Sequence, residues 1–182
     1  MLKNIGIFCS SRLKPNKNYS MIISELVKWL KLNKFNLVIG GESTGLMHSL
    51  SKTAFEEKIR VFGIINYNFK HEVKKNKYIT DLIITRTLEE RKKQFIARSD
   101  CFIFLPGGLG TLNELLDLIV KREYEEVTKN IFLISDELWN PFFKYLNYLT
   151  EKNMIKKDSI KKNIIFLEPK NIRHMRSIDV KN

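Results

Sequence analysis

The sequence contains little cysteine and no long apolar run. Its 182 residues include only Cys9 and Cys101, and each lies in or at the end of an apolar run, where free cysteine usually behaves as a small buried hydrophobic residue. No apolar run approaches the roughly 20 residues that a membrane-spanning helix needs. The first residues enter a strand pattern at once, which leaves no room for an export signal. We therefore expect a cytoplasmic protein with no disulfide framework and no membrane partner.

Several catalytic signatures are absent as well. His48, His71 and His174 show no metal-ligand spacing with one another or with the cysteines, so we expect no metal site. The sequence has no Gly-x-Ser-x-Gly nucleophile elbow, and neither cysteine has an activating neighbour. These absences argue against metal-assisted catalysis and against a serine or cysteine nucleophile.

The chain is basic, with a formal net charge of +12. Such a charge is compatible with a nucleic acid, an acidic lipid or an anionic small substrate as partner. Much of it is lysine scattered among asparagine and isoleucine, without an arginine-rich tract, an RNA-reading aromatic motif or zinc-finger spacing. A solvated basic surface explains the charge best. Nucleic-acid binding is the minority hypothesis, which steep salt dependence of polymer binding would support.

Short apolar runs alternate with longer amphipathic segments along the chain. This alternation is typical of βα repeats that build a parallel sheet, and the length fits one domain, residues 1–182. We expect a surface loop at Asn66–Lys77, which is polar and unpatterned, and a loosely held end over the last dozen residues. The predicted strands are Ile5–Cys9, Asn36–Ile39, Val61–Ile65, Leu82–Thr85, Cys101–Leu105, Ile131–Ile134 and Ile164–Leu167. Apolar residues at helical spacing predict helices around residues 22–30 and 112–120.

A glycine-rich segment, Pro106-Gly107-Gly108-Leu109-Gly110-Thr111, leaves a predicted strand and runs directly into a predicted helix. Ligands of open parallel sheets bind at such strand ends. Glycines let backbone N–H groups approach an anion, and a helix N-terminus adds about half a positive charge. The segment matches neither the Walker loop nor the dinucleotide fingerprint. A phosphate cradle and a plain strand-to-helix turn explain its glycines equally well.

Glu114 is the first candidate catalytic residue. Thr111-Leu112-Asn113-Glu114 fits a capping box, in which the Thr and Glu side chains satisfy each other's backbone donors, and in isolation capping is the better explanation. Its placement favours chemistry, because a carboxylate in the first turn of a helix that holds a phosphate lies within reach of a bound sugar. Both roles remain open at this point.

Arg91 interrupts an apolar helix face. Leu88 and Phe95 lie on that face of a helix predicted over residues 88–98, and Arg91 falls three residues after the first and four before the second. A structural ion pair, or an arginine whose head reaches water, explains this position as well as a functional guanidinium does. Lys92 either reaches the same crevice or is a solvated charge.

A second glycine-rich turn, Gly40-Gly41-Glu42-Ser43-Thr44-Gly45, follows another predicted strand. It offers the hydroxyl groups of Ser43 and Thr44 to a ligand. A turn stabilised by Ser/Thr hydrogen bonds is somewhat favoured as the explanation. Gly41, Ser43, Thr44 and Gly45 are nevertheless candidate substrate-binding residues.

Three of these segments together carry a family resemblance: Gly40-Gly41 with Gly45-Leu46-Met47, Arg91-Lys92, and Pro106–Thr111 with Glu114. They resemble the Lonely Guy family of cytokinin riboside 5′-monophosphate phosphoribohydrolases, from the first strand to about Thr150. The resemblance implies a Rossmann-like three-layer α/β sandwich with a mostly parallel sheet flanked by helices. It also implies a homodimer that hydrolyses nucleoside monophosphates to free base and ribose 5-phosphate without a metal or cofactor.

The resemblance also assigns roles to residues. The catalytic pair of the family falls on Arg91 and Glu114, its phosphate loop on Gly108–Thr111, and a glutamate near the base on Glu72. We expect cleavage of the N-glycosidic bond of a purine, adenine-type nucleoside 5′-monophosphate. The alternative is a non-catalytic nucleotide-binding or sensing protein, and release of free base distinguishes the two. Proteins with this motif are often described as lysine decarboxylases, but nothing here resembles the Schiff-base lysine of a pyridoxal site.

The chemistry is consistent with these residues. Departure of the base leaves an oxocarbenium-like sugar, so the Glu114 carboxylate can stabilise positive charge and orient or deprotonate water. We expect Arg91 to pair with Glu114 or the substrate and to hold the carboxylate ionised.

The chain departs from the family pattern around the expected site. Glu42 is the sharpest departure, because two like charges roughly 4 Å apart cost about 4 kcal/mol at an effective dielectric constant near 20. We expect Glu42 to pair with Arg12 or to turn outward, which leaves Gly41, Ser43 and Thr44 to meet the ligand. The other departures are Ser10 and His48 in place of glycine, Leu88-Glu89 in place of Met-His, and Val120-Lys121 in place of Thr-Trp.

Overall fold

A computed structural model describes residues 3–69 and 76–175 of the chain. Strands and helices alternate along these residues. The strands are β1 Asn4–Phe8, β2 Asn36–Ile39, β3 Val61–Asn66, β4 Asp81–Thr85, β5 Cys101–Phe104, β6 Ile131–Ile134 and β7 Ile165–Leu167. The α-helices are α1 Lys17–Leu32, α2 Gly45–Glu56, α4 Leu88–Arg98, α5 Leu109–Glu123, α6 Asn140–Glu151 and α7 Ser159–Asn163. The 3-10 helices are η1 Tyr67–Phe69, η2 Glu137–Trp139 and η3 Pro169–His174.

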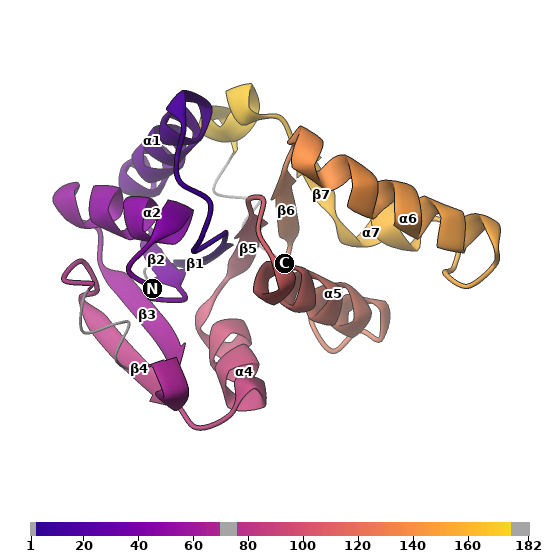
Figure 1. Ribbon diagram of the computed structural model, residues 1–182, viewed down its shortest axis with the longest axis horizontal. Helices are drawn as coiled ribbons and strands as arrows, with labels where there is room; N and C mark the ends of the chain where they lie inside the picture. The colour runs from indigo at the N-terminus through magenta and orange to yellow at the C-terminus, as the bar shows by residue number, and fades with distance from the viewer. Residues whose placement is uncertain (1–2, 70–75, 176–182) are drawn as a thin grey trace.

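The seven strands form one sheet with the order β4-β3-β2-β1-β5-β6-β7, and each neighbouring pair is parallel (Figure 1). The chain moves outward from β1 through β2 and β3 to β4, returns to pair β5 with β1, and then continues through β6 to β7. The order therefore reverses between β1 and β5. Ligands of open parallel sheets bind beyond the carboxyl ends of the strands at such a switch point.

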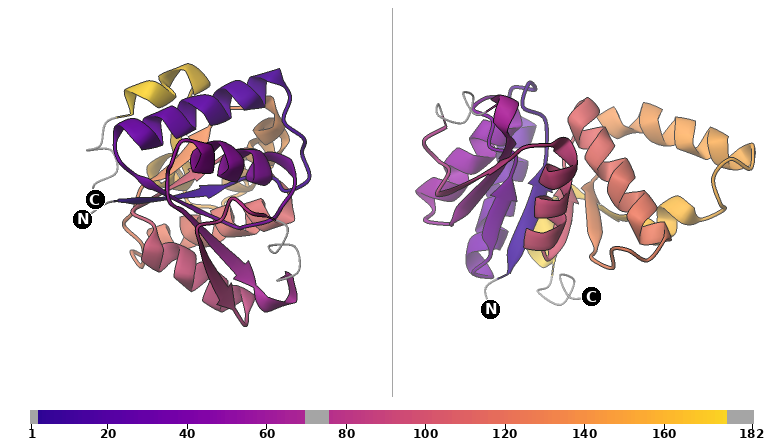
Figure 2. Two further views of the ribbon diagram at one scale, coloured as in Figure 1. Left: turned by 90° about the vertical axis from the view of Figure 1, so that its left-hand side faces the viewer. Right: turned by 90° about the horizontal axis from the view of Figure 1, so that it is seen from below.

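Helices cover both faces of the sheet and give three layers. The helices α1 and α2 lie with η3 over one face, and α4 and α5 lie over the other (Figures 1 and 2). Alternate strand side chains serve the two layers, so that Ile5 and Ile7 pack in the first core and Phe8 in the second. Burial on both faces explains why the strands are continuous apolar runs. The predicted Rossmann-like three-layer sandwich is confirmed, and its sheet is parallel throughout.

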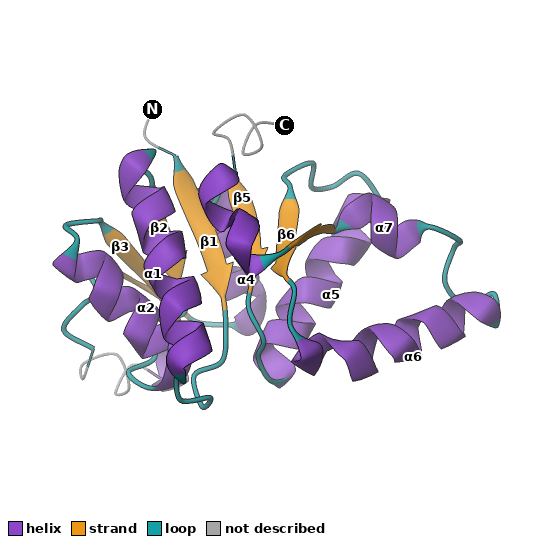
Figure 3. Cartoon of the chain, turned by 90° about the horizontal axis from the view of Figure 1, so that it is seen from above, coloured by secondary structure: helices purple, strands orange, loops and turns teal. Residues whose placement is uncertain are grey.

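Local signals set the start of two helices. Asn16 caps α1 by accepting a hydrogen bond from the Tyr19 N–H at 2.9 Å, and Thr87 caps α4 by accepting one from the Glu90 N–H at 3.1 Å. Each cap satisfies a backbone donor that the helix itself leaves unpaired. In contrast, α6 extends away from the centre of the sheet (Figure 3). In the part of the chain that the structure describes, no helix has both the length and the apolar character to cross a bilayer.

The expected strands agree with the observed ones to within one residue at each end. The expected surface loop Asn66–Lys77 needs correction. Asn66 is the last residue of β3, η1 follows it directly, and Asn76 is buried with 4% of its surface exposed. Residues 70–75 lie outside the described residues. The polar side chain of Asn76 is buried because it hydrogen-bonds to another loop, as described below.

The expectation of a loosely held end is wrong for residues 171–175. Ile172 and Met175 are buried in the core beneath α1. The Trp29 Nε1 of α1 donates a hydrogen bond to the Met175 carbonyl oxygen at 2.8 Å. Two buried apolar side chains and one backbone hydrogen bond hold this segment. So few contacts leave no periodic pattern in the sequence, and the sequence therefore did not indicate them.

Candidate active site

A pocket with a volume of about 300 Å³ opens at the carboxyl ends of the central strands. The segments after β1 and β2 contribute to its wall, together with α2, α4 and the first turns of α5. The pocket therefore lies at the switch point between β1 and β5. Its lining residues are Cys9, Ser10, Ser11, Arg12, Glu42, Met47, Arg91, Gly108, Leu109, Gly110, Thr111 and Glu114.

Ser10 joins the loops that form the pocket. Its N–H donates to the Pro106 carbonyl oxygen at 3.1 Å, and its own carbonyl oxygen accepts from the Met47 N–H at 3.2 Å. Its hydroxyl oxygen accepts from the N–H groups of Arg12 and Leu13 at 3.1 and 2.9 Å. Ser10 thus fixes the backbone after β1 against the segment after β5 and against the first turn of α2. The sequence marked Ser10 only as a departure, although a serine after a strand is a known signal for such a turn.

The turn after β2 packs against the segment after β1, which lines the pocket. The Thr44 hydroxyl donates to the Ser11 carbonyl oxygen at 2.6 Å. Gly45 has a φ of +64°, and a Cβ there would lie 2.5 Å from the Ser11 carbonyl group, so only glycine fits. Of the four candidate substrate-binding residues in this turn, Gly41, Ser43, Thr44 and Gly45, none lines the pocket. Thr44 and Gly45 contact the segment after β1 instead.

The segment after β5 places the start of α5 in the pocket wall. Gly108 is the N-cap residue, and no side chain caps the helix. Gly108, Leu109, Gly110 and Thr111 all line the pocket. The first N–H groups of a helix have no partner within the helix, so this turn presents donors and the positive end of the helix dipole. Gly107 lies outside the lining, and a Cβ on it would come within 2.1 Å of the Thr111 hydroxyl oxygen.

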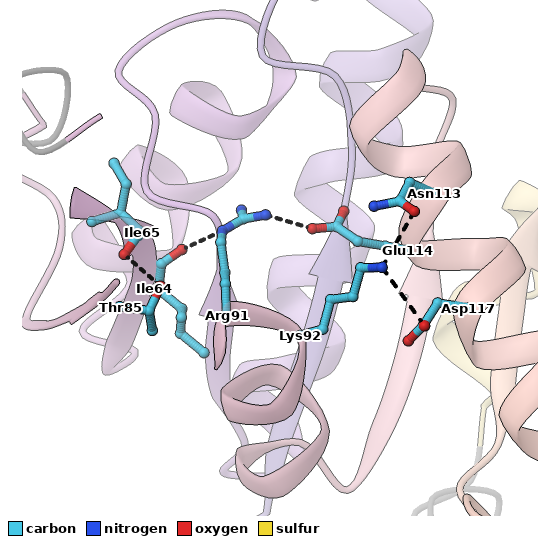
Figure 4. A network of polar contacts seen from close by, with 8 residues as sticks. All are labelled: Ile64, Ile65, Thr85, Arg91, Lys92, Asn113, Glu114 and Asp117. Carbon is cyan, nitrogen blue, oxygen red and sulfur yellow. Dashed lines mark hydrogen bonds and ion pairs between the residues drawn. The ribbon is translucent and has the colours of Figure 1, made fainter. Parts of the chain in front are cut away.

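The capping-box explanation of Glu114 is wrong. Because α5 begins at Leu109, Thr111 lies inside the helix and Glu114 lies in its second turn. The Glu114 carboxylate instead accepts a hydrogen bond from Arg91 Nη1 at 2.6 Å (Figure 4). The expected pairing of the two residues is confirmed. The side chains of Arg91 and Glu114 are 15% and 11% exposed, so both charges are largely removed from water.

Three contacts fix the Arg91 guanidinium. Besides the pair with Glu114, its Nε donates to the Ile64 carbonyl oxygen of β3 at 3.0 Å (Figure 4). Its Cζ lies 5.1 Å from the centre of the Phe95 ring. Phe95 is buried as expected, but Leu88 is 52% exposed, so the inner face of α4 starts at Arg91. The guanidinium is therefore anchored to the sheet on one side and to α5 on the other.

Lys92 does not reach the pocket. Its Nζ donates to Asn113 Oδ1 at 3.3 Å and lies 3.7 Å from Asp117 Oδ1, between α4 and α5 (Figure 4). Asp117 follows Glu114 by three residues on α5 and also pairs with Lys121 at 2.8 Å. The Lys92 ammonium group thus lies beside the Asp117 carboxylate on α5 and does not line the pocket.

Burial governs the protonation of the pocket. It raises the pKa of Glu114 to about 7; Arg91 and Lys92 oppose this shift, whereas the Glu42 carboxylate adds to it. Arg91 thus favours the ionised form of Glu114, as expected, but removal from water outweighs the ion pair. Burial also raises the pKa of the Cys9 thiol well above its usual range, so Cys9 contributes a neutral wall.

Glu42 points inward. It lines the pocket, and its Oε2 is buried without a hydrogen-bond partner. Arg12 also lines the pocket, but the described residues show no ion pair between Arg12 and Glu42. Both expected arrangements of Glu42 are therefore wrong. The Asn76 Nδ2 fixes this loop by donating to the carbonyl oxygens of Gly41 and Glu42 at 3.3 and 3.0 Å.

Glu72, expected near the base, lies outside the described residues. The part of the chain that the structure describes contains no group of three or more His, Cys, Asp or Glu side chains placed to hold a metal ion.

Solved structures share this fold. A molybdenum cofactor binding protein from the phototrophic bacterium Rippkaea orientalis is similar with a TM-score of 0.68 and 20% identity, over 94% of this chain and 93% of that one. The molybdenum cofactor carrier protein of Chlamydomonas reinhardtii is similar with a TM-score of 0.65 and 18% identity, over 91% of this chain and 89% of that one. At this identity the similarity supports the fold alone.

Sequence comparison identifies the family. The family model described as "possible lysine decarboxylase" matches residues 47–175. Cytokinin riboside 5′-monophosphate phosphoribohydrolase LOG5 of Arabidopsis thaliana is 32% identical over 85% of this chain and 68% of its own length. The probable enzyme of the same name, LOG4 of Oryza sativa subsp. japonica, is 30% identical over 91% of this chain and 72% of its own length. The chain with the paired Arg91 and Glu114 therefore belongs to the family described as possible lysine decarboxylase, also known as the Lonely Guy family.

Proposed function

We propose that this protein hydrolyses the N-glycosidic bond of a purine nucleoside 5′-monophosphate. The products are ribose 5-phosphate and a free adenine-type base, cytokinins included. The observation that carries this proposal is the buried pair of Arg91 and Glu114, 2.6 Å apart, in a pocket that also contains the N-terminal turn of α5. The names of the relatives support the same reaction class.

The phosphate is proposed to lie at the start of α5. The N–H groups of Leu109, Gly110 and Thr111 belong to the first helical turn, and Gly108 before them leaves the approach free of a side chain. Arg12 lines the same pocket and adds a full positive charge. A dianionic phosphate held there supplies binding energy remote from the reacting bond and positions the sugar for cleavage.

Glu114 is proposed to act at the sugar carbon. As the C1′–N bond breaks, its electron pair leaves with the base, which takes up a proton from solvent, and positive charge develops on the sugar. An ionised Glu114 stabilises this charge, takes a proton from the water that adds to C1′ and then releases that proton to solvent. Arg91 holds the Glu114 carboxylate in place through a charge-assisted hydrogen bond.

Incubation with a panel of nucleotides tests the proposal. The panel contains nucleoside monophosphates, the matching nucleosides and N6-modified adenylates, and chromatography detects free base. We expect release from purine monophosphates and little from nucleosides, which lack the phosphate. Nucleotide binding without release of any base would contradict the proposal and support a non-catalytic nucleotide-binding or sensing protein.

Replacement of Glu114 by glutamine should keep the fold and most nucleotide binding. Turnover should fall by roughly 10²–10⁴-fold, which is the usual contribution of a positioned acid–base group. Steady-state kinetics and thermal unfolding measured on the same preparation check both parts. A variant that loses thermal stability while its turnover stays near normal would show that Glu114 is only a structural partner of Arg91.

Replacement of Arg91 tests geometry separately from charge. Arg91→Ala should lower kcat/KM by roughly 10²–10³-fold, the cost of losing one preorganised donor. Arg91→Lys should recover only part of this loss, because an ammonium cannot reach both Glu114 and the Ile64 carbonyl oxygen as the planar guanidinium does. Full kcat/KM in Arg91→Lys would leave only a requirement for positive charge. Arg98→Ala, on the exposed end of α4, is the control.

The pH dependence follows from the raised pKa of Glu114. Only the ionised carboxylate can accept a proton from water, so kcat/KM should fall as the pH drops through about 7, where Glu114 becomes protonated. The residual activity of Glu114→Gln should lack this decline, whereas ionisation of the substrate phosphate remains in both proteins. A profile that rises toward acidic pH would instead make Glu114 a proton donor.

We also propose that the protein is a cytoplasmic homodimer. Leu116 and Val120 of α5 and Tyr124, its C-cap residue, recur every four residues and are 39%, 50% and 72% exposed, which gives an exposed apolar stripe along the helix that carries Glu114. A two-fold contact is the commonest way to bury such a stripe. Light scattering at working concentration should give twice the chain mass. A monomer with full activity would refute the dimer.

A further inference from the structure

Glu42 is an acceptor-bearing side chain inside the proposed site that the hydrolysis described above does not use. It lies in the loop between β2 and α2 and lines the pocket together with Arg91 and Glu114. Its Oε2 is buried and has no hydrogen-bond partner. A buried oxygen of this kind is costly unless a partner satisfies it. The pocket thus contains an unused acceptor beside the proposed reacting groups.

The position of Glu42 is built into the fold. Asn76 Nδ2 donates to the carbonyl oxygens of Gly41 and Glu42 and to the Ser51 hydroxyl at 3.2 Å, so the loop backbone is held from the far side. Gly40 leaves the space that the side chain enters. A Cβ on Gly40 would lie 2.6 Å from Glu42 Oε2 and 2.7 Å from Arg91 Nη2. Glu42 Oε2 and Arg91 Nη2 therefore both lie near the position of that Cβ, whereas Nη1 of the same guanidinium contacts Glu114.

The pocket lining carries charges of both signs. Glu42 lines it with the paired Arg91 and Glu114, and Arg12 and the first turn of α5 supply positive potential. A phosphate is repelled by Glu42 and favoured by the start of α5. The group of the ligand that faces Glu42 must then be a hydrogen-bond donor, because an ionised carboxylate only accepts.

The chemistry of a nucleoside monophosphate identifies this donor. If Glu114 faces C1′, then Glu42, whose Oε2 lies near the Nη2 end of the same arginine, faces a group bonded close to C1′. The 2′-hydroxyl is on the adjacent carbon, whereas the exocyclic amine of adenine lies at the far edge of the base. A carboxylate is also a suitable partner for a ribose hydroxyl, as in dinucleotide-binding folds.

We propose that Glu42 accepts a hydrogen bond from the 2′-hydroxyl of the substrate and so makes the pocket select ribonucleotides over 2′-deoxyribonucleotides. This inference rests on the proposed function, because it takes the place of the sugar from Glu114. It makes Glu42 a specificity-determining residue that contacts the substrate. Asn76 is a positioning residue that acts through the backbone of the Glu42 loop.

The test compares adenosine 5′-monophosphate with its 2′-deoxy and 3′-deoxy forms in the parent protein, Glu42→Ala and Glu42→Gln. The ratio of kcat/KM for the ribo and 2′-deoxy forms is measured in each protein, so that the different intrinsic lability of the two bonds cancels between proteins. Dissociation constants for the same ligands are measured by calorimetry in the Glu114→Gln background, where turnover is slow. Glu126→Gln, at an exposed glutamate in the loop after α5, controls for the change in net charge.

We expect the ribo preference to fall by about 10–100-fold in Glu42→Ala, which is the scale of one hydrogen bond to a charged group. Glu42→Gln retains an acceptor of the same size and should keep part of the preference. The 3′-deoxy form should be less affected by either change. Glu126→Gln should behave as the parent protein, and circular dichroism shows whether each variant is folded.

Two results would overturn the inference. One is an unchanged ribo preference in folded Glu42→Ala and Glu42→Gln. The other is an equal gain in affinity for all three nucleotides and for inorganic phosphate, which would mean that Glu42 only repels phosphate. If the parent protein binds ribonucleotides selectively through Glu42 but releases no base, the inference stands and the proposed hydrolysis fails. The binding measurements therefore distinguish failure of the Glu42 inference from failure of the proposed hydrolysis.

Discussion

Arg91 and Glu114 are buried together, and the organisation of the pocket depends on this shared burial. Removing two charges from water costs more than their attraction returns unless the remaining hydrogen-bonding groups also find partners. The Ile64 carbonyl oxygen supplies such a partner to Arg91, and the face of the Phe95 ring covers its guanidinium. Through Arg91 of α4, the pair therefore connects the backbone of β3 to the second turn of α5. Such a pair is poor evidence for stability and good evidence for a site.

The same burial explains why Glu114 is poised to titrate near neutral pH. An ion pair in water would keep a carboxylate ionised far below pH 7. Here the loss of hydration dominates, and a second carboxylate, Glu42, adds to it. The pocket lining therefore combines the acidic groups Glu42 and Glu114 with Arg91, Arg12 and the N–H donors at the start of α5. A ligand with one anionic end and a hydroxyl-bearing middle matches this arrangement of charge.

Close packing of the loops sets the shape of the pocket. Gly40, Gly45 and Gly107 each lack a side chain where another group comes within 2.6 Å or less of the position of a Cβ. Gly40 admits Glu42 and Arg91, Gly45 admits the backbone after β1, and Gly107 admits Thr111. The glycines of the two glycine-rich segments, after β2 and after β5, thus act in two ways. Gly108 and Gly110 leave the pocket face open, whereas the other three let the walls approach one another.

The sequence by itself determined the strand positions, the α/β class and the three segments that carry the family. These features are local: apolar runs, helical spacing and glycine-rich turns are properties of a few consecutive residues. Tertiary structure alone decided which chemical groups meet. The pairing of Arg91 with Glu114, the capture of Lys92 by Asp117 and the inward turn of Glu42 under Asn76 join distant segments. Each depends on how α4, α5 and the loops pack on the sheet, and that packing reflects the burial of the whole core rather than any local pattern.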